Sequence, residues 1–354
     1  MRFVRMAAAV LVVTWTNTAP AQAHSAAGSP SSNYTTTIRS VLPEPKGFTV
    51  RSIEQGSRLE VRWTSGEPAV VSGYEDEPYL RIGPDGVEEN RSSPATYVNR
   101  DRRGTTAAPQ TIDAQATPRW VAVSDRPVAR FHDHRAHYMG SVPPQAVDRQ
   151  PNLRRTIQRF DVPISQGKQK YVVSGVVEWV PSSSPVQYLA VSTAIIAVLV
   201  VAALWAGVSL TRRMTIRPLI IGALGALILV DFVHLAGIAG GVAGGSPVGR
   251  AISIGYASIA AWVIAVVSAV LWLKGRPDAL YLTTFAAGLM TLVGGIADLS
   301  ILGKPAVVFQ WAPSLARWCV ALTLGLGIGV LVAAVLLTRP SDSDAIIGNE
   351  RVGD

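Results

Sequence analysis

The 354-residue sequence is poor in charge and nearly devoid of cysteine. Only 16% of its residues are charged while 49% are hydrophobic, a balance typical of a protein that lipid covers in part. Its single cysteine, Cys319, excludes a disulfide within the chain and any metal site built from several thiolates. The chain also lacks a phosphate-binding glycine loop, a Gly-x-Ser-x-Gly elbow and a His-Glu-x-x-His helix. Enzyme chemistry is therefore the least expected class of function.

The first 23 residues have the pattern of an export signal. Arg2 and Arg5 precede an apolar stretch, and Ala21-Gln-Ala23 has the small residues of a cleavage site. The apolar stretch is shorter than the ~20 residues that a membrane span needs. We therefore expect a signal peptide over 1–23 whose removal leaves His24 as the first residue.

The rest of the chain divides at about residue 185. Residues 24–185 carry most of the Arg, Asp, Glu and Pro, and they are expected to form an extracytoplasmic domain. Residues 186–338 are expected to form a transmembrane bundle, and residues 339–354 a cytoplasmic tail. Five segments are long and apolar enough to span the membrane: about 187–210, 218–240, 251–273, 279–302 and 316–338.

Basic residues between these spans predict the orientation of the chain. Arginines and lysines gather after the first, third and fifth spans, which favours a cytoplasmic location for those loops and for the C-terminus. The expected location is the cell membrane, multi-pass, with the lipid bilayer as a partner. The net charge of +8 is spread along the chain rather than gathered on one element, so we expect no nucleic-acid partner.

Short runs of β-forming residues predict that residues 24–185 fold as an immunoglobulin-like β-sandwich. They include 48–53, 58–63, 69–74 and 170–179, and turn residues such as Pro84-Asp-Gly86 separate them. Residues 101–118 have little periodicity and are expected to form a long loop.

Three stretches carry a resemblance to known proteins: Gly73-Tyr-Glu-Asp-Glu-Pro-Tyr-Leu80, Ser93-Pro-Ala-Thr-Tyr97 and Phe131-His-Asp-His-Arg-Ala-His-Tyr-Met139. The chain resembles a family of exported actinobacterial membrane proteins, which implies the same architecture and no assigned activity. A histidine at the mature N-terminus before a β-sandwich is also similar, more loosely, to periplasmic copper carriers of the copper-resistance type.

His132, His134 and His137 are the first candidate site. On a strand the first two would share one face, and a bend would bring in the third. Neutral imidazole is a good ligand for copper and zinc. Asp133 would point the other way, as an outer-shell partner or in a salt bridge to Arg135. The alternative is a polar, hydrogen-bonded strand end.

His24 is a second candidate ligand. A free terminal amine and the imidazole of the same residue can chelate Cu(II) in the nitrogen-rich geometry that this ion prefers. The alternative is that histidine stands first by chance, before the flexible Ser-Ala-Ala-Gly-Ser-Pro stretch.

Asp231, His234 and Asp298 are expected to form a polar cluster inside the membrane. Asp231 and His234 are three residues apart on the second span, and Asp298 lies late in the fourth. Counted at ~1.5 Å per residue, all three lie in the outer half of the bilayer. Ionisable residues at this depth face the bundle interior and suggest a function. The alternative is a structural Asp–His bond that locks two helices.

These residues support three hypotheses. The first is an envelope membrane protein that binds or handles copper, or else zinc, as a carrier or sensor. The second is a non-catalytic interaction module that binds another envelope protein or a metal carrier without a metal of its own. The third is a metalloenzyme that uses the three histidines.

Overall fold

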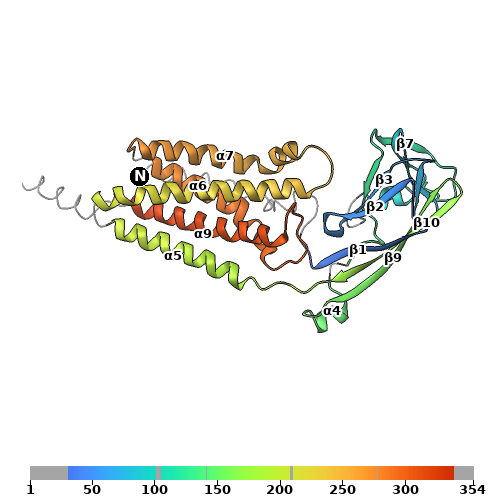
Figure 1. The fold of residues 1–354 in the computed structure, drawn as a ribbon, viewed down its shortest axis with the longest axis horizontal. Coiled ribbons are helices and arrows are strands. Elements are labelled where there is room, and N and C mark those ends of the chain that lie inside the picture. The colour runs from blue at the N-terminus through green and yellow to red at the C-terminus, as the bar shows by residue number, and fades with distance from the viewer. Residues whose placement is uncertain are drawn as a thin grey trace, which may run out of the picture. The chain divides into compact units, whose positions relative to one another are not determined.

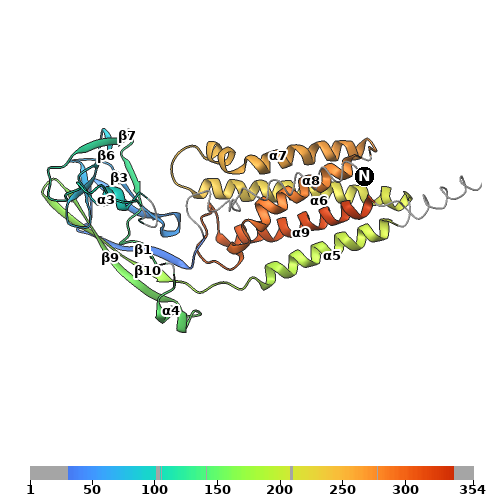
Figure 2. The same cartoon turned by 180° about the vertical axis from the view of Figure 1, so that it is seen from behind.

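The computed structural model describes residues 31–100, 104, 106–140, 142–207, 210–276 and 278–338. They form two compact units. The β unit contains Ser32–Ser182 and Lys304–Val307, and the helical unit contains the other described residues. Figures 1 and 2 show both units from opposite sides. The predicted signal peptide, His24 and the predicted tail lie outside the described residues.

The β unit is built from two antiparallel sheets. The larger has the strand order β1-β10-β9-β4-β5-β6-β7 and the smaller has the order β2-β3-β8. The strands of the larger sheet are β1 (Tyr34–Leu42), β4 (Ala69–Ser72), β5 (Pro78–Gly83), β6 (Gly86–Asn90), β7 (Trp120–Ser124), β9 (Arg155–Gln166) and β10 (Gln169–Trp179). The smaller sheet contains β2 (Phe48–Ile53), β3 (Arg58–Trp63) and β8 (Val128–Phe131), and the short helices α3 (Ala95–Val98) and α4 (Gln145–Arg149) lie in connections.

Aromatic side chains join the two sheets face to face. Phe48 of β2 and Tyr171 of β10 have ring centroids 5.0 Å apart, and Tyr79 of β5 lies 5.8 Å from Phe131 of β8. In both contacts the rings lie edge to face, an arrangement that aromatic pairs prefer. The buried core of the β unit contains Leu59, Val61 and Ile82 with other apolar side chains. The prediction of a β-sheet domain is thus confirmed, whereas its immunoglobulin-like topology stays a prediction.

The helical unit contains five helices long and apolar enough to cross a membrane. The chain is therefore a multi-pass membrane protein, as predicted. Four of these spans lie in α5 (Val186–Gly207), α6 (Leu210–Gly241), α7 (Pro247–Leu273) and α9 (Pro313–Leu337). The remaining one, Ala279–Ile296, begins as α8 (Ala279–Met290). The fourth predicted span, 279–302, is interrupted. It continues from α8 as a π-helical segment, η2 (Thr291–Ile296), and then as a 3₁₀ segment, η3 (Leu299–Leu302).

Small residues in the helical unit allow close approach of the chain. A Cβ atom added at Gly329 of α9 would lie 2.6 Å from Leu199 of α5, and one at Gly325 would lie 3.1 Å from the Ser192 backbone. This glycine pair therefore brings α5 and α9 together, as small residues do in membrane bundles. On α6, Gly237 faces the Phe309 ring instead.

Candidate functional site

The histidine segment forms a turn. Strand β8 ends at Phe131, so the expectation that His132 and His134 share one face of a strand is wrong. The reason is Asp133, whose side-chain Oδ1 accepts from the Arg135 amide at 3.0 Å and whose backbone oxygen accepts from the Ala136 amide at 2.8 Å. An aspartate that bonds its own backbone two residues on favours a turn over a strand.

Arg135 locks this turn to the neighbouring loop. Its guanidinium binds both oxygens of the buried Asp133 carboxylate at 2.9 and 2.8 Å, which confirms the predicted salt bridge. It also donates to the backbone oxygens of Ser72 and Gly73 at 2.9 and 3.1 Å. Burial alone would lower the pKa of Arg135, but the hydrogen bond and charge of Asp133 outweigh it and raise that pKa. The turn therefore rests on a bidentate, charged pair.

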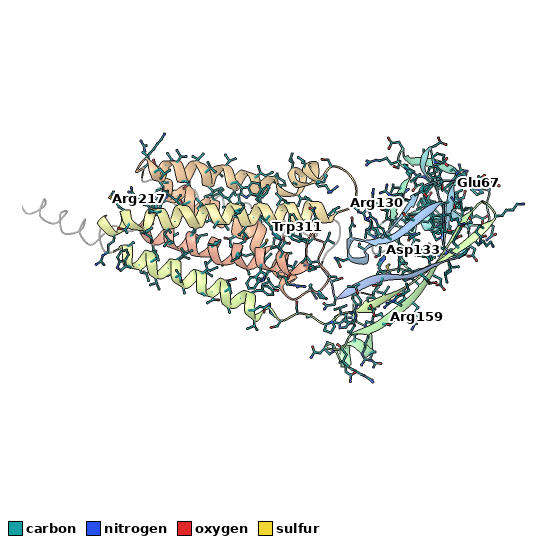
Figure 3. The ribbon with its side chains drawn as sticks, in the orientation of Figure 1. Glu67, Arg130, Asp133, Arg159, Arg217 and Trp311 are labelled. Atoms are coloured by element: carbon teal, nitrogen blue, oxygen red, sulfur yellow. The ribbon has the colours of Figure 1, made fainter. Side chains whose placement is uncertain are left out.

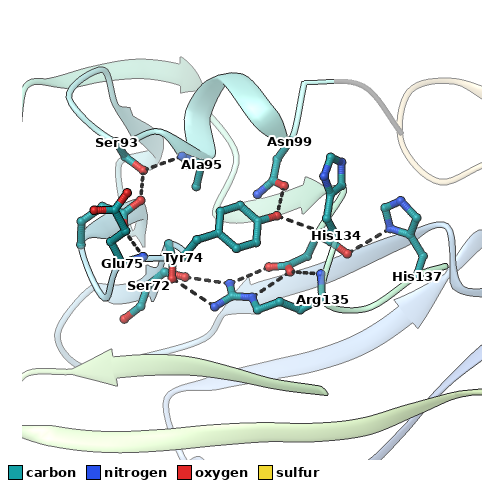
Figure 4. A network of polar contacts seen from close by, with 12 residues as sticks. Ser72, Tyr74, Glu75, Ser93, Ala95, Asn99, His134, Arg135 and His137 are labelled. Carbon is teal, nitrogen blue, oxygen red and sulfur yellow. Dashed lines mark hydrogen bonds and ion pairs between the residues drawn. The ribbon is translucent and has the colours of Figure 1, made fainter. Parts of the chain in front are cut away.

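Tyr74 lies between the Arg135 guanidinium and Asn99, as Figure 4 shows. The Arg135 guanidinium lies 4.9 Å from the Tyr74 ring centroid, and the Tyr74 hydroxyl accepts from the His134 amide at 3.0 Å and donates to Asn99. Burial and the negative charge of Asp133 raise the pKa of Tyr74 to about 12. The phenol is therefore neutral at physiological pH and stays a hydrogen-bond donor.

The three imidazoles lie close together around His137. The His134 and His137 ring centroids are 5.1 Å apart, and those of His132 and His137 are 6.1 Å apart. His137 Nδ1 donates to the Asp133 backbone oxygen at 3.0 Å, and His132 Nδ1 donates to the Ser57 oxygen at 2.8 Å. A neutral imidazole that donates from Nδ1 carries its lone pair on Nε2. Metal-binding histidines are commonly oriented through such a bond.

The donor set fits a metal in part. Two imidazoles that bind one ion at ~2.1 Å hold their centroids roughly 5 Å apart, close to the separation of His134 and His137. Yet in the part of the chain that the structure describes, no three His, Cys, Asp or Glu side chains are grouped so as to hold an ion. Asp133 is committed to Arg135. A site with three imidazoles therefore requires side-chain rotation.

Sequence reasoning missed several neighbours of His134. A Cβ atom added at Gly104 would lie 2.5 Å from His134 Cε1 and 3.5 Å from Met139 Cε. Both side chains therefore lie beside Gly104. Gly104 has a φ of +65° and packs directly against the imidazole. Tyr74 and Met139 both stand in the stretches that carried the family resemblance, but no spacing rule linked them to the histidines.

The predicted intramembrane residues are buried on facing elements of the helical unit. His234 of α6 and Asp298, just before η3, are each at most 2% exposed, with 3.7 Å between His234 Nε2 and Asp298 Oδ2. Asp231 lies one turn earlier on α6 and accepts from Trp262 Nε1 of α7 at 2.8 Å. The structure thus pairs His234 with Asp298 and bonds Asp231 to a different helix.

Asp231 also reaches the π-helical segment. A Cβ atom added at Gly294 would lie 2.2 Å from Asp231 Oδ1, so only glycine leaves room for the carboxylate there. π-Helical turns within α-helices are frequent at functional sites. The interruption of the fourth span thus lies where α6 places its carboxylate.

No family model, no curated protein and no solved structure matches the chain.

Proposed function

We propose that this membrane protein binds and handles a transition metal, copper before zinc, through an extracytoplasmic site at His134 and His137, with His132 as a further donor. The observation that carries the proposal is the pair of imidazole rings 5.1 Å apart, one of them oriented by a backbone oxygen. The Asp133–Arg135 pair and Tyr74 hold the backbone of the turn. Such outer-shell support is what metal sites depend on.

The donor types favour copper. Met139 lies beside Gly104, as His134 does. Its thioether is a soft ligand that suits Cu(I). No carboxylate is available from Asp133, because Arg135 occupies both of its oxygens. Imidazole and thioether without carboxylate suit copper better than zinc.

The test is metal titration of the full chain in detergent micelles. Cu(I) is titrated in competition with a chromogenic chelator and Zn(II) by calorimetry, for the wild type and for the double variant His134→Ala/His137→Ala. Loss of one outer-shell partner typically weakens metal binding 10–100-fold, so loss of two direct donors is expected to exceed about 100-fold.

The control is His24→Ala, which removes the other predicted copper ligand. It is expected to leave tight Cu(I) binding in place. If the double variant binds as tightly as the wild type, or if binding is lost only in His24→Ala, the turn is not the metal site.

A second candidate function is an interaction module, and strand β7 favours it. β7 is the last strand of the larger sheet, and it exposes Val121 and Val123 at 42% and 48%. An exposed edge strand can pair with an extended segment of another envelope protein. Absence of metal binding in the wild type would make this the better function.

A further inference from the structure

The outer face of the smaller sheet carries a cluster of arginines around one glutamate. Glu60 of β3 is the direct cross-strand partner of Arg51 on β2 and of Arg130 on β8. Arg62 follows Glu60 by two residues on β3, so it lies on the same face. We call these four residues the arginine face. Figure 3 labels Arg130 within it.

Glu60 orders the guanidinium groups of this face. Its side chain is 2% exposed, and its two oxygens accept from Arg51 Nε and Arg130 Nε, each at 2.7 Å, while Arg62 Nη2 lies at 3.7 Å. Burial alone would raise the pKa of Glu60, but the hydrogen bonds and charges of Arg51 and Arg130 outweigh it and lower that pKa. The carboxylate is therefore ionised, and it fixes two guanidiniums across three strands.

The arginine face carries a net positive charge. Three guanidiniums surround one carboxylate, an excess of two positive charges. Arg51 and Arg62 are 63% and 46% exposed. Within the described residues, Arg51 and Arg130 hydrogen-bond Glu60 through Nε alone. Their terminal Nη groups therefore remain available to a ligand outside the chain.

The excess is larger here than at the ion pairs of the larger sheet, where Glu89 lies near two arginines and so does Glu178. On the larger sheet, Arg81 of β5 forms a one-to-one pair with Glu88 of β6 at 2.6 Å, and its guanidinium stacks on Trp120. That pair is balanced in charge and its guanidinium has a second partner. A generally solvated, charged surface would not explain why three arginines meet at the buried carboxylate of Glu60.

We propose that the arginine face binds the phosphate groups of anionic phospholipid headgroups. Guanidinium presents a planar fork of donors that matches phosphate oxygens, and it is weakly hydrated, so it gives up water readily. Residues 180–185 join β10 to the membrane-spanning helix α5. Phospholipid is therefore the phosphate source at the highest local concentration for this face.

The test uses the full chain in nanodiscs of phosphatidylcholine, captured on immobilised vesicles. The vesicles are either phosphatidylcholine alone or an equal mixture with phosphatidylglycerol, and binding is measured by surface plasmon resonance. The double variant Arg51→Gln/Arg62→Gln leaves Arg130 and Glu60 as a balanced pair. Each arginine near an anionic surface contributes roughly fivefold, so the loss of two is expected to weaken binding roughly 30-fold.

The matched control is Arg81→Gln, which removes an arginine of similar type from a balanced pair. It is expected to bind the anionic vesicles as the wild type does. Equal binding by the double variant, or equal binding of the wild type to neutral vesicles, would overturn the proposal. So would saturation by inorganic phosphate that abolishes vesicle binding at physiological phosphate concentration, or tighter binding to polyglutamate, because the ligand would then be free phosphate or an acidic protein.

Discussion

Buried carboxylates are neutralised differently in the two units. In the β unit, three of the four buried carboxylates among the described residues have an arginine: Glu54 has Arg58, Glu60 has Arg51 with Arg130, and Asp133 has Arg135. The fourth, Glu77, accepts from the Ser93 hydroxyl and the Glu75 amide. In the helical unit, Asp231 accepts from the indole of Trp262 and Asp298 faces His234. The β unit thus pairs most of its buried carboxylates with permanent cations, and the bundle uses a neutral donor and a titratable base.

The difference follows from the two surroundings. Arginine is always protonated, and a guanidinium beside water can bring its charge to a partly buried carboxylate at moderate cost. Inside a bilayer a permanent charge costs about 2.5–3.5 kcal/mol even on insertion scales, so partners that can be neutral are favoured. The arginine-paired carboxylates of the β unit are therefore fixed structural charges. Those of the bundle have partners that can be neutral.

The largest effect is expected when the fixed charge of the β unit is removed. Asp133→Asn keeps an oxygen for the turn but leaves Arg135 without its counter-ion, and breaking a buried pair in this way costs about 3–5 kcal/mol. The free energy of unfolding is measured by urea titration of the full chain in micelles, followed by the β-sheet circular dichroism signal. Arg81→Gln, in a more exposed pair, is the control and should cost about 1 kcal/mol or less.

A result below about 1 kcal/mol for Asp133→Asn would contradict the view that this pair is a structural charge. It would also remove the reason for treating the histidine turn as a preorganised site, because the turn rests on the same carboxylate.

The corresponding substitution in the bundle, Asp231→Asn, is expected to change the free energy of unfolding less, and not to lower it. In Asp231→Asn the amide oxygen still accepts from Trp262, and no charge remains to be buried in the membrane. We expect the stability to be unchanged or raised by up to about 1 kcal/mol. Stability is measured by unfolding in mixed micelles with a rising fraction of dodecyl sulfate.

Asp231→Leu serves as the companion variant, because it removes the acceptor and leaves the Trp262 N–H without its partner. If Asp231→Asn destabilises the bundle as much as Asp133→Asn destabilises the β unit, then Asp231 also is a fixed charge and the contrast between the two units fails.

Much of the fold was predictable because its signals are local. Strands 48–53 and 58–63 were predicted from β-forming residues and coincide with β2 and β3. The five spans were predicted from length and hydropathy, which need no tertiary information. The π-helical segment Thr291–Ile296 was not predicted, and its Gly294 packs against Asp231 of α6, a contact between residues far apart in the sequence.

The candidate site was predictable in its residues but not in its geometry. Imidazole spacing pointed to His132, His134 and His137, yet a period-two strand pattern was assumed where Asp133 makes a turn. The partners of Arg135 at Ser72 and Gly73 are more than 60 residues away in the chain. The arginine face was missed for the same reason, since it is assembled by the register of three strands.

The smallest expected effect is a pH dependence of stability that arises from Glu60. Its carboxylate is buried, but the arginines around it are partly exposed to water. Its pKa in the folded chain is lowered below the ordinary value of 4.5. A carboxylate with a lowered folded pKa stabilises the fold fully above its unfolded pKa and loses that contribution as the pH falls through the folded pKa. The difference in melting temperature between wild type and Glu60→Gln is therefore expected to be constant above about pH 5 and to shrink below it.

Glu88→Gln, which removes a more exposed carboxylate, controls for the general loss of negative charge. A wild-type advantage that stays constant down to about pH 3 would mean that the three guanidiniums do not act on an ionised Glu60, and the arginine face would lose the anchor that orders it.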